Sequence, residues 1–489
     1  MTLSRRHFCG LAACTGLTLG LGGCAVNPAT GKQDFLLTGA EDEKQLGMQE
    51  HPKILQQFGG VYDDPAAGGY VATIGGRLAA ASETPNLGFT FTLLNSPIVN
   101  AFALPGGFVY ISRGLMALAE DEAELAGVLG HEIGHVVARH SAQRRSRAML
   151  AQLGAGLLGA VVGGEASQLA GGVAGLYLQS YSRDQELEAD MLGIRYLGRA
   201  GYDANAMTSF LEKMRANSQL EALVAGRSPT DVDAYDITAT HPRTIARVQQ
   251  AAALAANGAR VSQVRQRDTY LDTINGMIFG DGPDQGYVRG QRFVHPELRF
   301  EFTVPDGFIL RNTPEQVVAS SAADQAQIVF DNAPKPFQGN MSTYIARDWA
   351  SGIRLNGLEA ITINGFEAAT ATVSGKIGNA AAELRLLAIR FDSRRIFRFM
   401  FLAPTAAMRR LTVPLQRTTF SFRRITPVQA AALKPKRLQV VQADAGASAG
   451  TYAARMAFDK YPRERFLVLN GLAENGSLNG RNRVKLVVE

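Results

Sequence analysis

Cysteine is almost absent from this chain of 489 residues. Its three cysteines, Cys9, Cys14 and Cys24, all lie within the first 24 residues, so the rest of the chain has none. This distribution excludes disulfide frameworks, cysteine-based zinc knuckles and thiol nucleophiles from the body of the protein. Acidic side chains are absent from the same 24 positions, so this segment differs in kind from the remaining sequence.

Long basic runs are missing too. Fifty Lys and Arg residues oppose 44 Asp and Glu residues, for a net charge of +6 that is spread along the chain. A nucleic-acid partner would require a concentrated basic face, so we exclude nucleic acid as a main partner. The hydrophobic content of 46% and the charged content of 19% are typical of a globular chain. The length predicts more than one domain.

The first 23 residues resemble an export signal. Arg5 and Arg6 precede a short apolar, glycine-rich run over residues 9–23, as in the twin-arginine pattern. The run ends in Leu-Gly-Gly-Cys, which resembles the lipobox of bacterial lipoproteins and implies cleavage before Cys24 and lipid on that residue. Several acyl chains would hold the mature protein firmly on a membrane, facing the periplasm. Ala25 favours the outer membrane, and an ordinary signal with a chance cysteine remains the alternative.

Changes in composition divide the remainder of the chain and predict a multidomain α+β protein. The segment 153–164 is apolar, but it is shorter than the roughly 20 residues of a membrane span. It can be a buried helical hairpin, a lid or a membrane contact. The expected parts are a mainly helical domain at 24–275, a linker at 276–291, an α+β domain with an antiparallel sheet at 292–425, a linker at 426–437 and a small βααβ unit at 438–489.

The most informative string is His131-Glu132-Ile133-Gly134-His135. It lies in an apolar helical pattern for which Asp121 is the expected N-cap, with Glu124 completing a capping box. Positions i and i+4 share a helix face, so both imidazoles can bind one ion. Neutral imidazoles favour zinc. Glu132 lies one step round the helix, where it can act on a water and leave the metal to the histidines.

The third metal ligand has to come from elsewhere in the chain. Proteases with the pattern HExxHxxGxxH would need Gly and His where this chain has Ala138 and Ser141. His140 is out of that register by one position, and we interpret it as a surface residue.

A second helix offers a better third ligand. Ser182 and Gln185 predict a capping box at its start. Glu186 and Asp190 are four residues apart and share a face, so Glu186 can bind the metal while Asp190 accepts the free N–H of a ligating histidine. Glu188 points about 200° away from Glu186 on a helical wheel and is expected in solvent.

These motifs together resemble the zinc metalloendopeptidase family that includes the CAAX prenyl proteases and the HtpX-like membrane proteases. The resemblance rests on HEIGH, on Glu186-x-Glu-Ala-Asp190, and on Thr240-His241-Pro242 followed by Arg247. It covers about residues 25–260, and the export signal with Asn27-Pro-Ala-Thr-Gly points to the periplasmic lipoprotein branch of the family.

The resemblance implies a gluzincin-type protease domain at 24–275 with one zinc per chain. It implies His131, His135 and Glu186 as ligands and Glu132 as catalytic acid and base. His241 would stabilise an oxyanion or occupy the open metal position, and Arg247 could assist it. As an alternative, His241 simply begins a helix before Pro242.

An extended substrate can pair with an exposed strand edge, which reads backbone more than sequence. The candidate edge is Asn100-Ala101-Phe102-Ala103, just before the HEIGH helix. This mode of binding suits unfolded or misassembled envelope polypeptides as substrates and predicts a role in protein quality control.

The final segment, 438–489, resembles a diverged LysM module, which implies peptidoglycan as a partner. Ala443-Asp444-Ala445 departs from the expected Gly-Asp-Thr, so a purely structural role is an equal alternative. Another class of function also remains, in which the protein is a lipoprotein chaperone or adaptor for outer-membrane protein assembly with a self-inhibited metal site. The intact Glu132 favours the enzyme.

Overall fold

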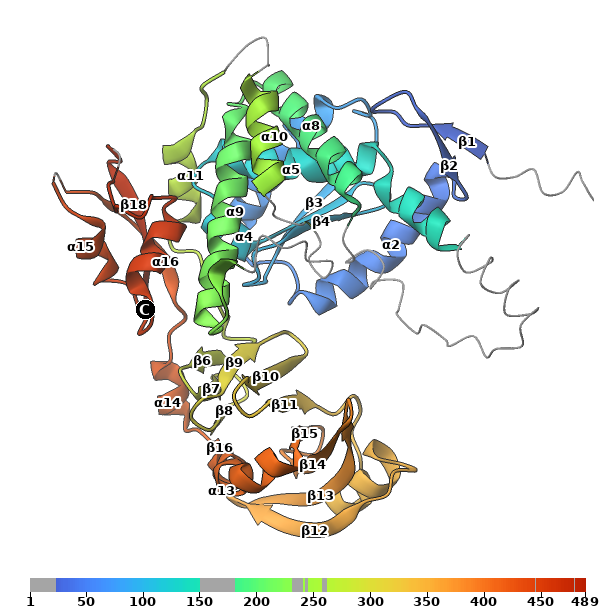
Figure 1. Ribbon diagram of the computed structural model, residues 1–489, viewed down its shortest axis with the longest axis vertical. Coiled ribbons are helices and arrows are strands. Elements are labelled where there is room, and N and C mark those ends of the chain that lie inside the picture. Colours follow the sequence, from blue (N-terminus) through green and yellow to red (C-terminus); the bar gives the residue numbers. More distant parts are fainter. Residues whose placement is uncertain are drawn as a thin grey trace, which may run out of the picture. The chain divides into compact units, whose positions relative to one another are not determined.

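The computed structural model describes residues 23–149, 181–230, 241, 245–256, 262–444, 446–478 and 480–489 (Figure 1). All but the last residue of the expected signal segment 1–23, and the whole apolar segment 153–164, lie outside these residues. The chain forms two compact units, one joining the residues up to Met277 to Leu438–Val488, the other formed by Ile278–Arg437. Mixed helices and sheets in more than one unit agree with the predicted α+β class at this coarse level.

The first unit is built mainly from helices. The central one, α5, packs against α3, α8 and α9, and α10 packs against α8 and α9 (Figure 1). Every α5 residue except Val136 is buried, so the helix that carries HEIGH lies in the core of this unit. The helices before Met277 include α2 (Ala40–Gln57), α3 (Pro65–Ala80), α4 (Arg113–Leu118), α5 (Glu122–Val137), α8 (Arg183–Arg199), α9 (Asn205–Val224), α10 (Ile245–Ala256) and α11 (Arg267–Ile274).

A three-stranded sheet lies beside these helices, with strand order β3-β5-β4. It consists of β3 (Thr90–Leu94), β4 (Ala101–Leu104) and β5 (Phe108–Ser112). β5 is parallel to β3 and antiparallel to β4, which leaves β4 at an edge. Gly106 turns the chain between β4 and β5 at φ +80°, and a Cβ there would lie 2.6 Å from the Lys44 Cα of α2. Only glycine therefore fits this turn.

The N-terminal part of the described chain is a short hairpin of β1 (Gly23–Val26) and β2 (Gln33–Leu36). The two strands pair antiparallel. Leu36 is buried, and the backbone N–H of Leu37 donates to Ser146 Oγ at 3.0 Å. The hairpin is thereby joined to the segment that comes after α5.

The C-terminal segment belongs to the first unit. Its order of elements is the expected βααβ, with β17 (Arg437–Gln442), α15 (Ala449–Ala453), α16 (Pro462–Leu469) and β18 (Arg483–Val488). Lys485 is fully buried, and its Nζ donates to the carbonyls of Ala117, Leu118 and Ala119 at 3.0, 3.3 and 2.7 Å. The segment 438–489, expected as a separate small unit, is thus packed against the residues just before α5.

The second unit contains a seven-stranded sheet, in the order β12-β13-β14-β15-β11-β10-β9, and a four-stranded sheet, in the order β16-β8-β7-β6. Each paired strand of the seven-stranded sheet is antiparallel to its neighbour. The strands are β6 (Tyr287–Arg289), β7 (Arg292–His295), β8 (Phe300–Thr303), β9 (Ile309–Asn312), β10 (Gln316–Ser321), β11 (Ala326–Asn332), β12 (Asn356–Ile363), β13 (Phe366–Ile377), β14 (Ala380–Arg390), β15 (Ile396–Pro404) and β16 (Arg423–Arg424).

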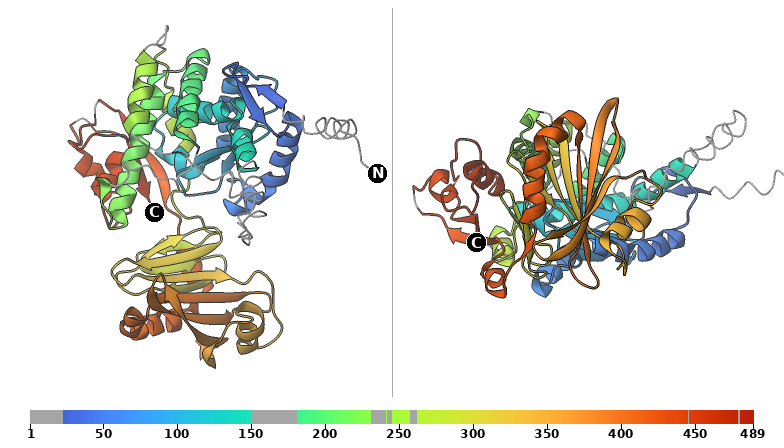
Figure 2. Two further views of the ribbon diagram at one scale, coloured as in Figure 1. Left: turned by 45° about the vertical axis from the view of Figure 1, so that its right-hand side comes forward. Right: turned by 90° about the horizontal axis from the view of Figure 1, so that it is seen from below.

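Successive residues of the large sheet face two separate cores, as the period of two requires. Leu387 belongs to the core on which α13 (Thr405–Ser421) packs, and Leu386 belongs to the core beneath α12 (Met341–Tyr344) and η2 (Ile345–Trp349) (Figure 2). The two predicted linkers are partly ordered, because 276–291 contains β6 and 426–437 contains α14 (Pro427–Ala432). In the described part of the chain, no helix combines the length and apolar character needed to cross a bilayer.

Candidate metal centre

α5 places both histidines of HEIGH on one face. The Nε2 atoms of His131 and His135 lie 3.0 Å apart. Asp121 caps the helix as predicted, since its Oδ1 accepts the Glu124 N–H at 2.8 Å. The reciprocal half of the predicted capping box is absent, because the Glu124 carboxylate accepts the N–H of Glu120 at 2.8 Å.

Glycine lets α8 approach α5 closely at the metal centre. A Cβ on Gly134 would lie 3.1 Å from the Ala189 carbonyl oxygen, and a Cβ on Gly193 would lie 2.9 Å from the backbone nitrogen of His131. Larger residues at this crossing would force the two helices apart. The close approach brings the carboxylates of α8 within reach of the α5 imidazoles.

Glu186 is the carboxylate of α8 that faces both histidines. Ser182 and Gln185 form the predicted capping box and orient the first turn of the helix. Glu186 Oε1 lies 3.6 Å from His135 Nε2, and its Oε2 lies 3.7 Å from His131 Nε2. The side chain is only 2% exposed.

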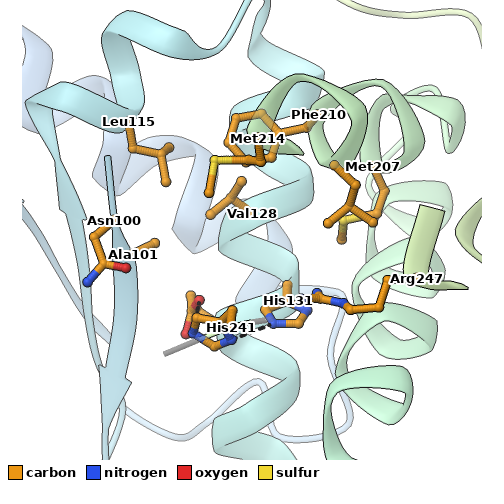
Figure 3. A pocket seen from close by; sticks show the side chains of 12 residues that line it. Asn100, Ala101, Leu115, Val128, His131, Met207, Phe210, Met214, His241 and Arg247 are labelled. Atoms are coloured by element: carbon orange, nitrogen blue, oxygen red, sulfur yellow. Dashed lines mark hydrogen bonds and ion pairs between the residues drawn. The ribbon is translucent and has the colours of Figure 1, made fainter. Parts of the chain in front are cut away.

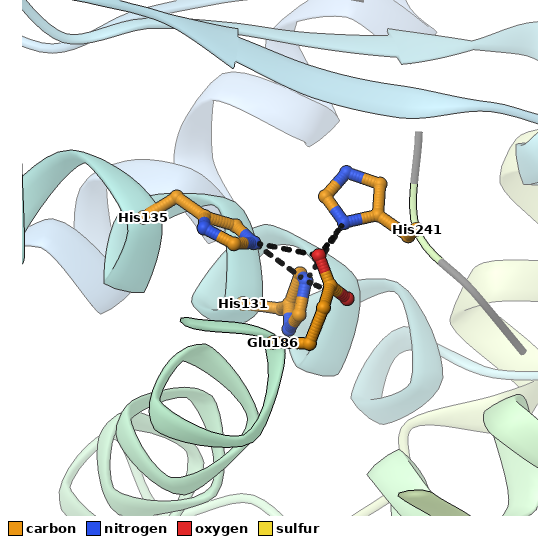
Figure 4. A group of neighbouring side chains, drawn as sticks. All are labelled: His131, His135, Glu186 and His241. Atoms are coloured by element: carbon orange, nitrogen blue, oxygen red, sulfur yellow. Dashed lines mark hydrogen bonds and ion pairs between the residues drawn. The ribbon is translucent and has the colours of Figure 1, made fainter. Parts of the chain in front are cut away.

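His241 completes the group from the segment before α10 (Figure 4). Its Nδ1 lies 2.9 Å from Glu186 Oε1 and 3.2 Å from His131 Nε2. One candidate ligand atom from each of His131, His135, Glu186 and His241 can be chosen so that all four lie within 4.8 Å of one another. Thr240 and Pro242, the neighbours of His241 in the family motif, lie outside the described residues.

The donor set fits a metal ion. Three imidazole nitrogens and a carboxylate oxygen point into one small volume, where neutral nitrogen lone pairs would repel one another without a cation between them. Imidazole and carboxylate ligands in this number are those of protein-bound transition metals.

Arg247 holds the carboxylates behind the group. Its Nε and Nη2 donate to Asp190 at 2.8 and 2.7 Å, and its Nη1 lies 2.7 Å from Glu186 Oε2. Asp190 Oδ1 in turn lies 2.8 Å from His131 Nδ1, the arrangement predicted from the sequence. Burial opposes ionisation of Asp190, but the charge of Arg247 outweighs it, and the pKa of Asp190 lies well below its ordinary value.

Glu132 lies beside the histidine group without facing it as Glu186 does. Its Oε1 is 3.4 Å from His241 Nε2, and its Oε2 accepts no hydrogen bond within the described residues. Burial raises the pKa of Glu132, although the nearby His241 and His131 oppose the shift. Glu132 is thus a buried carboxylate with one free acceptor atom at the centre.

His140 and Glu188 are not where the sequence pattern predicted. His140 is fully buried, with Nδ1 2.8 Å from His135 Nδ1 and Nε2 3.2 Å from Glu188 Oε2. The surface interpretation was wrong because α5 ends at Val137, and Arg139 at φ +56° turns the chain back. Glu188 is half-buried, since the hydrogen bond with His140 draws it inward and lowers its pKa.

Tyr181 is a residue of the centre that the sequence analysis missed. Its ring stacks on His135 with the centroids 3.9 Å apart and the planes 17° apart. Its hydroxyl pairs with Ser141 Oγ at 2.9 Å. The position just before the Ser182 cap was the only signal in the sequence, and it says nothing about stacking.

A largely apolar pocket opens beside the centre (Figure 3). Asn100 and Ala101, at the start of the edge strand β4, lie on one side of it, and Met207 and Phe210 of α9 lie on the other. The predicted substrate strand is therefore an edge strand at the pocket, although Phe102 and Ala103 are buried in the core of the unit. Its pairing with a substrate stays a prediction.

Comparison with known proteins finds similarity within the first unit. Residues 65–255 match the model of Peptidase family M48. The beta-barrel assembly-enhancing protease of Escherichia coli (strain K12) is 34% identical over 222 residues, which are 43% of either chain. That of Yersinia pestis is 38% identical over 166 residues, 32% of this chain and 34% of its own.

A plant relative also matches part of the chain. Mitochondrial metalloendopeptidase OMA1 of Arabidopsis thaliana is 36% identical over 138 residues, 28% of either chain. The chain thus spans less than half the length of each of these relatives. The similarity to these relatives therefore covers only part of the chain.

Proposed function

Because residues 65–255 match the model of Peptidase family M48, we propose that the chain is a zinc-dependent metalloendopeptidase. The observation that carries the proposal is the convergence of His131, His135 and Glu186, with His241 beside them, on one buried volume. His131, His135 and Glu186 hold the zinc, and each chain binds one zinc ion. When bound, zinc supplies a Lewis acid that polarises the scissile carbonyl and acidifies a water.

Glu132 is the proton carrier. It is buried, lies one residue from a ligand on the same helix, and keeps one oxygen without a hydrogen bond among the described residues. A buried carboxylate whose pKa is raised by burial can take a proton from the attacking water and return it to the leaving amine. Arg247 is engaged with Asp190 and Glu186, so we assign it to holding these carboxylates in place.

The proposed substrates are misfolded or unassembled polypeptides of the cell envelope. An extended peptide would lie along β4, with a large apolar side chain in the pocket next to Met207, Phe210 and Met214. Unfolded chains expose both extended backbone and apolar side chains. The names of the bacterial relatives, which refer to β-barrel assembly, support the same class of substrate.

The test of this proposal is Glu132→Gln. The variant should keep about one zinc per chain, because no ligand is lost, and should lose cleavage of an unfolded substrate such as casein. Substantial cleavage by a zinc-replete variant would reject the mechanism. Comparing the envelope proteomes of cells with either form would then identify the natural substrates.

A second candidate is a chaperone or adaptor for outer-membrane protein assembly with a self-inhibited metal site. The observation that favours it is His241, whose Nδ1 lies 2.9 Å from Glu186 and 3.2 Å from His131 Nε2, where it can act as a fourth ligand. If the protein works with His241 bound as a fourth ligand, Glu132→Gln should leave the assembly of outer-membrane proteins unimpaired in cells. If the state is only a resting form, Glu132→Gln should impair assembly.

We also propose that lipid on Cys24 holds the protein on the periplasmic face of a membrane, with the outer membrane favoured. Cys24→Ser, correctly processed, should then be released as a periplasmic protein, and a processed variant that still pellets with membranes would contradict this.

The segment 438–489 is proposed to bind peptidoglycan. The test is sedimentation of the full mature protein with purified sacculi. If the protein does not sediment with the sacculi, the proposal is wrong, and the role of this segment is the packing described at Lys485.

A further inference from the structure

His140 lies directly behind one of the two histidines of HEIGH. α5 ends at Val137, and Arg139 in the left-handed region turns the chain so that the next residue returns beneath the helix. His140 is fully buried there, and both of its ring nitrogens have a partner. Its Nδ1 lies 2.8 Å from His135 Nδ1, and its Nε2 lies 3.2 Å from Glu188 Oε2.

The protons along this chain of three residues have one consistent arrangement. His135 Nε2 faces His131 Nε2 at 3.0 Å, so it is the atom that would bind the metal and must carry no proton. The proton of His135 is then on Nδ1 and is donated to His140 Nδ1. His140 must in turn carry its proton on Nε2, which donates to the Glu188 carboxylate.

We propose that His140 is a positioning residue for His135, with Glu188 as the carboxylate that completes the chain. This inference rests on the proposed metal ligation by His135. His140 selects the tautomer of His135 that can bind the ion and fixes the plane of its ring. Ligating histidines commonly donate to a carboxylate directly, whereas here a second, neutral imidazole lies between them.

Two further contacts enclose the chain. Tyr181 stacks on the face of His135 at 3.9 Å, so the ring is fixed both at its face and at Nδ1. On the far side, Asn27 Nδ2 lies 3.5 Å from Glu188 Oε1 and 3.5 Å from the carbonyl oxygen of Ala138. Asn27 is 4% exposed and directly follows β1, so the N-terminal hairpin covers the Glu188 end of this series of hydrogen bonds.

The test is zinc affinity, measured on the full mature protein by competition with a chromogenic chelator. His140→Phe keeps a ring of similar size but removes both nitrogens, and it should weaken zinc binding about ten- to a hundredfold. Glu188→Gln keeps an acceptor oxygen and loses only the charge, so its loss should be smaller. His140→Phe that binds zinc within about twofold of the wild type would overturn the proposal.

The matched control is Glu83→Gln. Glu83 also contacts α8, through Arg195 and Arg199 at 3.1 and 2.9 Å, and its side chain is 18% exposed against 25% for Glu188. Its loss should leave zinc affinity unchanged. If His140→Phe does not fold, Glu188→Ala takes its place, because a half-buried carboxylate tolerates truncation. Zinc affinity of Glu188→Ala equal to that of Glu83→Gln would then overturn the proposal.

The cobalt-substituted protein separates this inference from the proposed function. If His135 binds the ion, His135→Ala should abolish the visible d–d bands, and His140→Phe should shift them while Glu83→Gln should not. Bands that persist unchanged in His135→Ala would reject the ligand set itself. Bands lost in His135→Ala but unchanged in His140→Phe would reject only the positioning role.

Discussion

His131 and His135 lie one helical turn apart, yet their outer nitrogens meet different kinds of partner. His131 Nδ1 lies against Asp190, a buried carboxylate that Arg247 holds through two hydrogen bonds. His135 Nδ1 meets the imidazole of His140, behind which a half-buried Glu188 lies. We call Asp190 with Arg247 the charged support of His131, and His140 with Glu188 the support of His135. The charged support is short, whereas the support of His135 is longer and ends near solvent.

The difference shows how the protein divides two tasks. Arg247 also lies 2.7 Å from Glu186, so the support of His131 is electrostatically joined to the candidate carboxylate ligand. The support of His135 leads outward to the N-terminal hairpin through Asn27. The contacts of His131 balance the buried charges of Asp190 and Glu186 with that of Arg247. The contacts of His135 fix the orientation of its ring without placing a further full charge in the core.

The largest effect is expected from breaking the charged support. Arg247→Met should lower the free energy of unfolding of the metal-free protein by about 3–5 kcal/mol, because it leaves Asp190 and Glu186 buried without a cation. Urea unfolding followed by circular dichroism measures this. The single tryptophan, Trp349, lies in the second unit, so its fluorescence transition should not move.

The control for this variant is Arg199→Met. Arg199 pairs with Glu83 at 2.9 Å, but its side chain is 47% exposed, and such pairs contribute less than about 1 kcal/mol. Equal shifts for the two arginine variants would mean that the charged support contributes no more than a surface ion pair.

A middle effect is expected at the helix crossing that both supports share. Gly193→Ala would place a Cβ 2.9 Å from the His131 backbone nitrogen, so α5 and α8 must separate, at a cost of about 1–3 kcal/mol. Gly198→Ala, on the same helix, meets open space and should stabilise by up to about 1 kcal/mol. Chelator competition should also show weaker zinc binding for Gly193→Ala alone.

The smallest effect is the difference between the two outer carboxylates. Asp190→Asn should weaken zinc binding about ten- to a hundredfold, because Asp190 meets a candidate ligand directly. Glu188→Gln acts through His140, and we expect it to lose several-fold less. Titration of both variants against one chelator checks the order. Equal losses would erase the distinction between the two supports.

Local patterns predicted the parts of the centre that lie within one helix. The spacing of His131 and His135, and that of Glu186 and Asp190, follow from the period of the α-helix, and the Ser182 cap from a short-range hydrogen bond. The environments of His140 and Glu188 could not be predicted in this way. They depend on a left-handed turn at Arg139 and on a hairpin more than a hundred residues away.

The fold shows the same limit. Alternating strands and the order of elements in the C-terminal segment are local properties and were predicted. The assignment of that segment to the first unit rests on contacts far apart in the sequence, such as those of Lys485 with three carbonyls, for which no local pattern exists.

Lys485 makes the packing of the first unit depend on the order in which the ribosome synthesises the chain. Its acceptors, the carbonyls of Ala117, Leu118 and Ala119, come just before α5, and the lysine follows Ala117 by 368 residues. A growing chain therefore carries HEIGH, and then all of Ile278–Arg437, before this donor exists. The carbonyls at the end of α4, just before the helix that bears both histidines, therefore receive these hydrogen bonds only when the chain is almost complete.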